Sequence, residues 1–518
     1  MDSVVVIGGG VGGLTTAAVL ARSGVNVTVL EAHIYPGGCA GTFYHQGYQF
    51  DAGATLAGGF YPGGPMDLVA REAGVSRWPA EEDDLAMVVH LPGRPPIHRW
   101  SDDRRWKERQ QAFGDFGMGF FEWQERTADA VWELALKGLP WPPQTFRDLS
   151  NLALRGGRWA LNPQVMRQLP SLIKAGASSM QAYLKGANDE LRLFIDAQLL
   201  ISAQATSAQA NALYGAAALD LPRRGIAHLK GGMGTIASTL ASAVEAHGGE
   251  VRYRNHVTKV EKRAGKFSVE VRRGDPLEAD LIIFNLPPWN IRSIAENIAS
   301  DRLHSLPPMP EDGWGAAVLY AGIDAGFLPE GTPLHHQVIL SEPLGEGNSV
   351  YLSLSPPWDN TRAPDGKRAV TFSTHTNLGD WWDLYENQPQ GYERRREQIT
   401  EKMLQAAEVA LPGFIQAVEL KLPGTPVTFQ RFTRRRWGWV GGFPQTSLFR
   451  AWGPRLAENV WMVGDSIFPG QSTASVALGG LRVAQTILDR KVIVRSTQLP
   501  DTISTSEYTD SEVRHVEV

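Results

Sequence analysis

The sequence begins with a short apolar run that leads directly into a cluster of glycines. Residues 4–7 read VVVI, which is typical of a buried parallel strand, and residues 8–13 read GGGVGG. An Ala- and Leu-rich segment at 14–22 favours a helix, and residues 25–31 favour a second strand. The pattern predicts a βαβ unit with a Gly-x-Gly-x-x-Gly turn between its first strand and its helix.

This glycine turn has the chemistry of a dinucleotide-phosphate site. Gly8 permits the tight turn, Gly10 lets the backbone approach a pyrophosphate, and Gly13 permits close packing of helix and strand. The helix N-terminus supplies N–H groups and the positive end of a dipole. Glu31 can accept hydrogen bonds from ribose hydroxyls and would repel a 2′-phosphate. We therefore predict an adenine dinucleotide at these residues, with Gly12 included in the site.

FAD and NAD both fit that fingerprint, but two further glycine turns favour FAD. Gly37 and Gly38 follow Glu31 closely and leave exposed backbone near the pyrophosphate. Gly53 lies in a short segment after another turn. FAD needs a second contact region, remote in sequence, whereas an NAD half-domain does not.

The far end of the chain offers that second region. Asp465 follows Gly464 and a predicted strand, and it can accept hydrogen bonds from ribityl hydroxyls or from backbone amides. The alternative for Asp465 is the N-cap of the last helix. A helix that begins near Thr473 would direct its N-terminus at a flavin ring.

Two kinds of sequence pattern alternate along the 518 residues. Strand–helix units recur in three segments, at 1–76, 221–290 and 455–490. The segments between them, 77–220 and 291–454, are rich in aromatic helices and in alternating strands, respectively. We predict an α/β fold, in which a discontinuous Rossmann-type FAD-binding domain carries an inserted α+β substrate domain with a mixed sheet and a helical cap. Residues 491–518 lose periodicity and are predicted to be a disordered tail.

Charge and cysteine content exclude several classes of protein. Lys+Arg minus Asp+Glu is 50 − 55 = −5, which gives no support for nucleic-acid binding. The single cysteine, Cys39, excludes an internal disulfide and a multi-cysteine metal site, and we predict no metal. Two long uncharged stretches, 3–21 and 197–219, are too rich in glycine or in polar residues to span a membrane.

Five stretches together resemble the carotenoid desaturase and carotene isomerase branch of the flavin amine-oxidase superfamily. They are VVVIGGGVGGL, VLEAHIYPGGCAGTF, GYQFDAGAT, GGMGTIASTLASAVEAHGGEV and VWMVGDSIFPGQSTASVALGGLRVA. The resemblance covers essentially residues 1–490, and PGGCAGTF and GDSIFPGQ are most similar to the carotenoid 3,4-desaturase and carotene isomerase subgroups. It implies FAD contacts at Gly8, Gly10, Gly13, Glu31, Gly38, Val257 (by its backbone to adenine), Gly464 and Asp465.

The resemblance also implies an FAD-dependent oxidoreductase. It would introduce a double bond into an acyclic carotenoid, with the 3,4 position favoured. An allylic C–H gives a hydride to the flavin N5 and the adjacent carbon loses a proton. The alternatives are a carotene cis–trans isomerase that uses reduced FAD, and a polyene-binding flavoprotein without turnover. A quinone or oxygen is the expected electron acceptor of the desaturase.

Few residues are candidates for the chemistry itself, because a polyene delocalises a cation and needs no strong base. His375, on a predicted strand, is the one catalytic candidate, and a hydrogen-bonded structural histidine is its alternative. Cys39 is interpreted as a small residue beside the cofactor. Cys39-Ala40 stands where amine oxidases carry an arginine pair, which disfavours an amine substrate. The run 434–436 is interpreted as a solvated or phosphate-facing basic run, with a substrate role as the alternative.

The segment 104–143 interleaves Arg and Lys with Trp and Phe. It fits either ordinary core aromatics of a helical cap or a membrane-facing surface through which a water-insoluble polyene enters. On the second reading, we expect a cytoplasmic protein bound peripherally to a membrane through Phe120, Phe121 and Trp123. If these aromatic residues do not form the entry surface, residues 197–219 are the next candidate for it.

Overall fold

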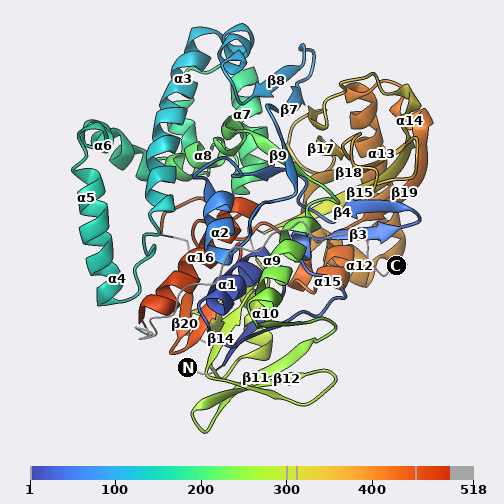
Figure 1. Cartoon of the computed structure of the whole chain (residues 1–518). Coiled ribbons are helices and arrows are strands. Elements are labelled where there is room, and N and C mark those ends of the chain that lie inside the picture. Colours follow the sequence, from blue (N-terminus) through green and yellow to red (C-terminus); the bar gives the residue numbers. More distant parts are fainter. Residues whose placement is uncertain (1–2, 299–300, 311–312, 450–451, 491–518) are drawn as a thin grey trace.

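The computed structural model describes residues 3–298, 301–310, 313–449 and 452–490, and Figure 1 shows their arrangement. The predicted tail at 491–518 lies outside the described residues. Two large sheets organise the chain, and each is built from segments with one of the two kinds of sequence pattern. They confirm the predicted α/β fold class. The division into two domains stays a prediction.

The first sheet has six strands in the order β10-β2-β1-β14-β21-β20. All neighbours are parallel except β20, which is antiparallel to β21. The strand order places β1 at the centre, where every residue of its VVVI run is buried. The strands are β1 (Val4–Ile7), β2 (Val27–Leu30), β10 (Glu250–Arg252), β14 (Leu281–Phe284), β20 (Arg455–Ala457) and β21 (Val460–Met462).

Small residues let the helices of this region approach one another closely. The Thr16 hydroxyl in α1 donates to the backbone carbonyl of Gly480 in α16 at 3.0 Å. A Cβ on Gly480 would lie 2.4 Å from the carbonyl oxygen of Gly12. The helices are α1 (Val11–Arg22), α2 (Pro65–Ala73), α9 (Gly234–Ala246), α10 (Pro288–Ile294), α11 (Asp301–His304) and α16 (Thr473–Arg490).

The second sheet has seven strands in the order β19-β15-β18-β17-β16-β7-β8. Its neighbours are antiparallel except β16 and β7, which run parallel, so the sheet is mixed. The strands are β7 (Leu85–His90), β8 (Ile97–Trp100), β15 (Trp314–Asp324), β16 (His335–Ile339), β17 (Ser349–Leu354), β18 (Lys367–Asn377) and β19 (Val418–Gly424).

One face of this second sheet is closed by helices. Phe372 of the sheet packs with Trp381 and Phe414 in a buried cluster. The helices here are α12 (Leu378–Asn387), α13 (Pro389–Ala410), α14 (Phe414–Ala417) and α15 (Pro426–Thr433).

Three small sheets lie beside the two large ones. The strand at 257–263 forms an antiparallel pair with the strand at 266–271. Asp51 at the end of β4 is tied to Arg362 at 2.9 Å and accepts the Met233 N–H at 2.8 Å. The strands are β3 (Thr42–His45) with β4 (Tyr48–Asp51), β5 (Ala57–Gly58) with β6 (Ala80–Asp83) and β9 (Ile226–Leu229), and β11 (Val257–Arg263) with β12 (Lys266–Val271) and β13 (Leu277–Ala279).

The helical cap projects from the second sheet, at the upper left of Figure 1. Its longest helix, α3, is interrupted at Gly114, whose φ is +61°. The remaining helices are short, and a π-helical turn at 152–156 joins two of them. The helices are α3 (Arg104–Leu136), α4 (Phe146–Asn151), α5 (Gly157–Ala160), α6 (Pro163–Gly176), α7 (Asp189–Ala203) and α8 (Ala212–Ala218).

Candidate active site

A cavity of about 740 Å³ extends from the glycine turn after β1 to the strands of the second sheet. Eleven of the thirteen residues predicted to form the site line this cavity. They are Gly8, Gly10, Glu31, Gly37, Gly38, Gly53, Val257, His375, Gly464, Asp465 and Thr473. The structure therefore brings together residues that lie up to 465 positions apart in the chain, counted as 473 − 8.

The glycine turn folds around Asn285, a residue that the sequence patterns did not single out. The Asn285 amide donates to the Gly8 carbonyl at 3.2 Å. A Cβ on Gly8, whose φ is +102°, would lie 2.8 Å from the Asn285 carbonyl oxygen, and one on Gly10 would lie 2.6 Å from its amide nitrogen. Only glycines fit this cradle. The available signal for Asn285 was its place at the carboxyl end of a buried strand.

Gly12 and Gly13 lie outside the cavity lining, unlike the other glycines of the motif. A Cβ on Gly13 would lie 2.5 Å from the Gly8 carbonyl oxygen. A Cβ on Gly12 would lie 3.1 Å from the Gly464 nitrogen. Both residues thus serve close packing of α1 on its neighbours, which is the role inferred for Gly13 from the sequence. Neither Gly12 nor Gly13 lines the cavity, so this placement does not support their inclusion among the cofactor contacts, which stays a prediction.

Glu31 is held rigidly at the cavity wall. One carboxylate oxygen accepts the Gly9 N–H at 2.7 Å and the other accepts the His33 N–H at 2.7 Å. Burial raises the pKa of Glu31, and these backbone N–H groups oppose that rise. Each oxygen keeps a lone pair that can accept a hydroxyl, because a carboxylate has about four acceptor positions. The geometry suits a ribose diol.

Asp465 forms an ion pair with Arg435 at 2.7 Å. The N-cap alternative for Asp465 is wrong, because α16 begins eight residues later, at Thr473. Of the two interpretations of residues 434–436, the solvated one is wrong for the middle member, and the phosphate-facing one stays a prediction. Arg434 and Arg436 are exposed, whereas the Arg435 side chain is only 16% exposed and donates to the Trp439 carbonyl at 2.6 Å.

Cys39 lines the cavity close to this ion pair. Burial raises the pKa of its thiol, with Arg435 acting in the opposite direction. The thiol therefore stays protonated near neutral pH and lacks the character of a nucleophile. This fits the interpretation of Cys39 as a small residue in the cofactor wall.

His375 on β18 lines the same cavity. Its Nε2 lies 3.2 Å from the Gln204 side-chain nitrogen, and its ring meets the edge of Trp314 with 5.7 Å between centroids. Burial lowers the pKa of His375 to about 4. The imidazole is therefore neutral at pH 7 and a weaker base than the sequence suggested. Its catalytic role stays a prediction.

Beyond the cofactor residues the cavity wall becomes largely apolar. The apolar side chains come from the cap helices, from the second sheet and from the segments that join the two sheets, and include Leu56, Met87, Leu200, Ile201, Val318 and Phe429. Within the described residues, no group of three or more His, Cys, Asp or Glu side chains is placed to hold a metal ion. A long apolar ligand that reaches the cofactor residues fits this wall.

Of the aromatic side chains predicted to face a membrane, Phe120 and Phe121 are buried and Trp123 is half-buried. Phe120 is 5% exposed and Phe121 is 3% exposed, and both belong to a core cluster with Phe194. Trp123 stacks on Tyr183 with 3.8 Å between centroids. The segment 197–219 is largely buried as well. These residues form the core of the cap, so the prediction of a membrane surface at Phe120, Phe121 and Trp123 is wrong.

No helix in the described part of the chain combines the length and the apolar character needed to cross a bilayer. This agrees with the rejection of the two uncharged stretches as spans.

Comparison with known families identifies the cofactor that the glycine cradle binds. The model for the family described as flavin containing amine oxidoreductase matches residues 11–488. The chain belongs to this family. Members of this family contain a flavin, and the dinucleotide predicted at the glycine cradle is therefore FAD. The glycine cradle, the Glu31 carboxylate and the N-terminus of α16 fit that group.

Relatives within the flavin amine oxidoreductase family confirm the resemblance to carotenoid desaturases and isomerases. Prolycopene isomerase of Arabidopsis thaliana is 29% identical over 516 residues, which covers 93% of this chain and 82% of that protein. The neurosporene-forming phytoene desaturase of Cereibacter sphaeroides is 23% identical and covers 92% of each chain. The 4,4'-diapolycopen-4-al dehydrogenase of Metabacillus indicus is 22% identical, covering 94% of this chain and 96% of that protein.

Solved structures show the same fold. An oxidoreductase from Methanosarcina mazei superposes with a TM-score of 0.61 at 18% identity, covering 93% of this chain and all of that one. Putrescine oxidase superposes with a TM-score of 0.60 at 15% identity, covering 94% and 99% of the two chains. The protein is an FAD-dependent oxidoreductase of this fold.

Proposed function

We propose that the protein introduces a double bond into an acyclic carotenoid, with the 3,4 position as the preferred bond. The observation that carries the proposal is the cavity, which continues from the FAD cradle into an apolar space between the second sheet and the cap. A polyene is long and apolar, and its burial against such walls is favourable. The 3,4 position rests on the resemblance of PGGCAGTF and GDSIFPGQ to 3,4-desaturases.

The chain holds FAD and shapes the space beside it. Bound FAD supplies a two-electron acceptor for a hydride equivalent from the substrate. Glu31 would hold the ribose, the turn at Gly8 and Gly10 the pyrophosphate, and the N-terminus of α16 the flavin end. The apolar walls keep water away from the substrate. His375, neutral at pH 7, could accept a proton only weakly, which suits a reaction that needs no strong base.

A carotene cis–trans isomerase is the second candidate. The identity of 29% with a prolycopene isomerase over 93% of this chain favours it. It would use reduced FAD and need no external electron acceptor, whereas the desaturase would pass electrons to a quinone or to oxygen.

Expression in cells that make lycopene or a hydroxylated lycopene separates these candidates. A desaturase lengthens the chromophore, and an isomerase changes its geometry without lengthening it. Unchanged pigments in both strains, with FAD bound, contradict desaturation and favour either a polyene-binding flavoprotein or an isomerase that acts on another geometric isomer.

A carotenoid is water-insoluble, so we also propose that the protein binds a membrane surface through α4, the π-helical turn, α5 and α6, here called the arm (146–176). Six of the twelve large hydrophobic side chains that are exposed among the described residues lie on the arm: Phe146, Leu149, Leu154, Leu161, Met166 and Ile173. The arm stands out from the left side of the molecule in Figure 1.

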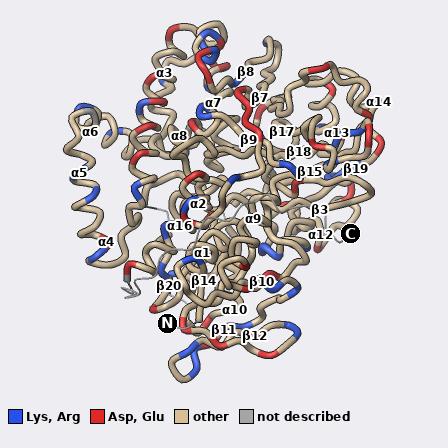
Figure 2. The backbone as a smooth tube through the Cα atoms, in the orientation of Figure 1, with Lys and Arg blue, Asp and Glu red and all other residues tan. Residues whose placement is uncertain are grey.

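The charge of the arm suits an anionic lipid surface. Its five basic side chains, Arg147, Arg155, Arg158, Arg167 and Lys174, are all exposed, while its one acidic residue, Asp148, is buried. Figure 2 shows this basic character along α4, α5 and α6. The whole chain has a net charge of −5, so the arm departs from the average surface. Apolar and basic side chains on one short helical segment are typical of interfacial binding.

The arm is anchored on the cap rather than being part of its core. Val165 and Leu172 of α6 pack with Ala130 of α3 and with Leu213 of α8. The arm thus exposes side chains that this packing leaves uncovered.

Vesicle binding tests the arm. Phe146→Ser, Leu149→Ser and Leu154→Ser together should reduce binding to vesicles that contain phosphatidylglycerol, while FAD content stays unchanged. The matched control is Tyr385→Ser, Val409→Ser and Ile415→Ser, which removes three exposed large hydrophobic side chains elsewhere.

Wild-type binding should also weaken with salt, because charges are screened over about 8 Å at physiological ionic strength. Equal binding of the arm variant and the control variant contradicts the proposal.

A further inference from the structure

One cavity residue is out of place in a site for a pure hydrocarbon. Arg99 on β8 lines the cavity among apolar side chains. Its guanidinium donates to the side-chain oxygen of Gln198 and, at 2.9 Å, to the Leu219 carbonyl. No carboxylate of the described residues lies within 4.0 Å of it. A guanidinium has five N–H donors, so these two contacts leave donors unused.

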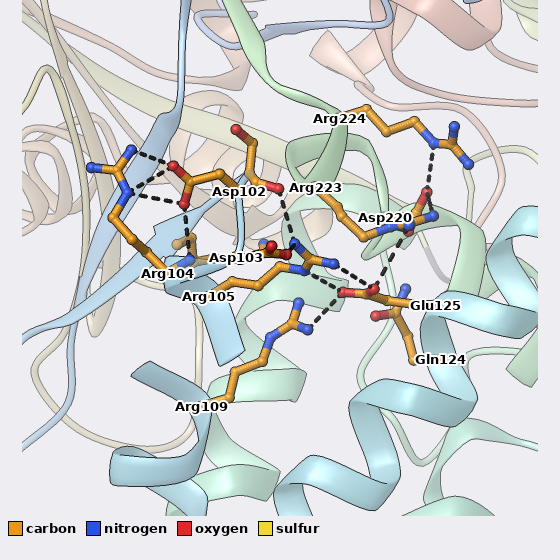
Figure 3. A network of polar contacts seen from close by, with 12 residues as sticks. Asp102, Asp103, Arg104, Arg105, Arg109, Gln124, Glu125, Asp220, Arg223 and Arg224 are labelled. Atoms are coloured by element: carbon orange, nitrogen blue, oxygen red, sulfur yellow. Dashed lines mark hydrogen bonds and ion pairs between the residues drawn. The ribbon is translucent and has the colours of Figure 1, made fainter. Parts of the chain in front are cut away.

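The arginines next to Arg99 are paired quite differently. Figure 3 shows their network, in which Arg105 and Arg109 contact Glu125 at 3.0 and 2.6 Å, and Arg223 and Arg224 contact Asp220. A small cleft is lined by Arg99 together with Arg105, Arg109 and Arg223, so they are neighbours. The nearby acids are thus already engaged with other arginines.

Burial without a close counter-charge makes the Arg99 cation costly. Burial lowers the pKa of Arg99 to about 9, and the positive charge of Arg109 lowers it further. A buried charge is stabilised only when its hydrogen-bonding groups find acceptors. An acceptor on a ligand would lower this cost.

A second polar group without a partner lies in the same wall. The Tyr351 hydroxyl is buried and has no hydrogen-bond partner within 3.5 Å in the part of the chain that the structure describes; Ser353, the polar side chain that acts on it, only partly opposes the rise that burial causes in its pKa. Tyr351 lines the cavity, as do Gln198 and Gln337, whose side chains bond to each other. Buried polar groups are normally satisfied, so an orphaned hydroxyl near an unpaired cation points to a missing ligand group.

We propose that Arg99 and Tyr351 form an oxygen-binding subsite in the substrate cavity, so that the preferred polyene carries an oxygen-bearing end group. A carboxylate, a carbonyl or a hydroxyl would accept from the guanidinium. A carboxylate binds most tightly because it also supplies the counter-charge. This inference rests on the proposed function, in that a polyene occupies the cavity.

Binding of three probes to the FAD-loaded protein in detergent micelles tests the subsite. The probes are lycopene, a hydroxylated lycopene and an acyclic carotenoid carboxylate, and the change in polyene absorbance gives the dissociation constant. We expect the carboxylate to bind at least about tenfold more tightly than lycopene, with the hydroxylated form between them, because a hydrogen bond to a charged group contributes about 1.5–3 kcal/mol.

Variants assign the preference to its residues. Arg99→Met should abolish it, and Tyr351→Phe should reduce it. The matched control is Arg368→Met, which removes another half-buried guanidinium that donates to a backbone carbonyl outside the cavity lining. The control should keep the wild-type preference.

Each outcome bears either on the subsite or on the proposed function. Equal binding of the three probes by the wild-type protein overturns the subsite, even if Arg99→Met fails to fold. A preference that survives in Arg99→Met overturns it too, and Arg99→Lys, which keeps the charge, should retain part of it. Absence of binding for every polyene contradicts the proposed function instead, and so the two failures are distinguishable.

Discussion

The two ends of the cavity are built from different material. At the cofactor end the wall is backbone, with Gly8 and Gly10 pressed against Asn285. At the substrate end the wall is side chain, with Arg99 from β8, Gln198 from α7 and Tyr351 from β17. A backbone wall fixes the position of a phosphate chain for any sequence that keeps its glycines. A side-chain wall changes its preference with single substitutions, so we expect this end to select the substrate.

The largest effect is expected from a substitution that disrupts the backbone wall of the cofactor end. In Gly10→Val, the new side chain would start from a Cβ only 2.6 Å from the Asn285 amide nitrogen and would fill the phosphate position. Such overpacking costs about 1–3 kcal/mol, so FAD binding should weaken by about fivefold or more and FAD content should fall. The bound flavin of the purified protein, measured by absorbance, checks this.

Gly157→Ala is the control for Gly10→Val, since a Cβ there meets nothing within 4 Å. It should retain all its FAD. A Gly10→Val protein that folds and keeps its full flavin would show that the cradle does not hold the pyrophosphate.

A smaller effect is expected at the ion pair of the cofactor end. Asp465→Asn removes the counter-charge of Arg435 and weakens a hydrogen bond of the charged kind, worth about 1.5–3 kcal/mol. We expect FAD to dissociate about tenfold more readily, as measured by dilution and flavin fluorescence. Cys39→Ala changes only a small side chain in the same wall and should have little effect. Equal FAD retention by the two variants would remove Asp465 from the cofactor site.

The cofactor end could be predicted because its signals are local in sequence. Gly8, Gly10 and Glu31 lie within one βαβ unit, and steric needs of the turn dictate their residue types. The partner of Asp465 could not be predicted, because Arg435 reaches it only through tertiary packing. Charge density in 434–436 gave no sign that the middle arginine is buried.

Local patterns failed more clearly in the substrate region. The aromatic and basic residues of 104–143 have the composition of a membrane surface, yet Phe120 and Phe121 face the cap core. Which face of a helix is covered depends on its neighbours, here Phe194 of α7. Half of the exposed large hydrophobic side chains among the described residues lie instead on the arm. Arg99 gave no sequence signal because its lack of an acidic partner is a property of the fold.

The smallest expected effect concerns pH at the substrate end. Burial lowers the pKa of His375 to about 4 from an ordinary value of 6.5, so its imidazole stays neutral across the physiological range. We predict that turnover depends little on His375 protonation between about pH 5 and pH 8 and declines as the pH falls toward 4. Comparison of the pH–rate profiles of the wild type and His375→Gln checks this. A step near pH 6.5 that is lost in His375→Gln would contradict the low pKa.

The same shift has a consequence for stability. The unfolded chain takes up a proton at His375 below about pH 6.5, whereas the folded chain resists protonation until the pH nears 4. The free energy of unfolding should therefore fall as the pH is lowered through this window. The fall should be smaller in His375→Gln, and denaturant unfolding at several pH values measures it.

Anaerobic mixing of the FAD-loaded protein with a hydroxylated acyclic carotenoid tests most directly whether the cavity brings flavin and polyene together for reaction. Absorbance follows the flavin and the polyene in one experiment. We predict that the flavin colour bleaches while the polyene spectrum moves to longer wavelength, in matched amounts and without oxygen. A polyene spectrum that stays unchanged with both oxidised and reduced FAD, although the polyene is bound, would contradict a redox or isomerising role for this cavity.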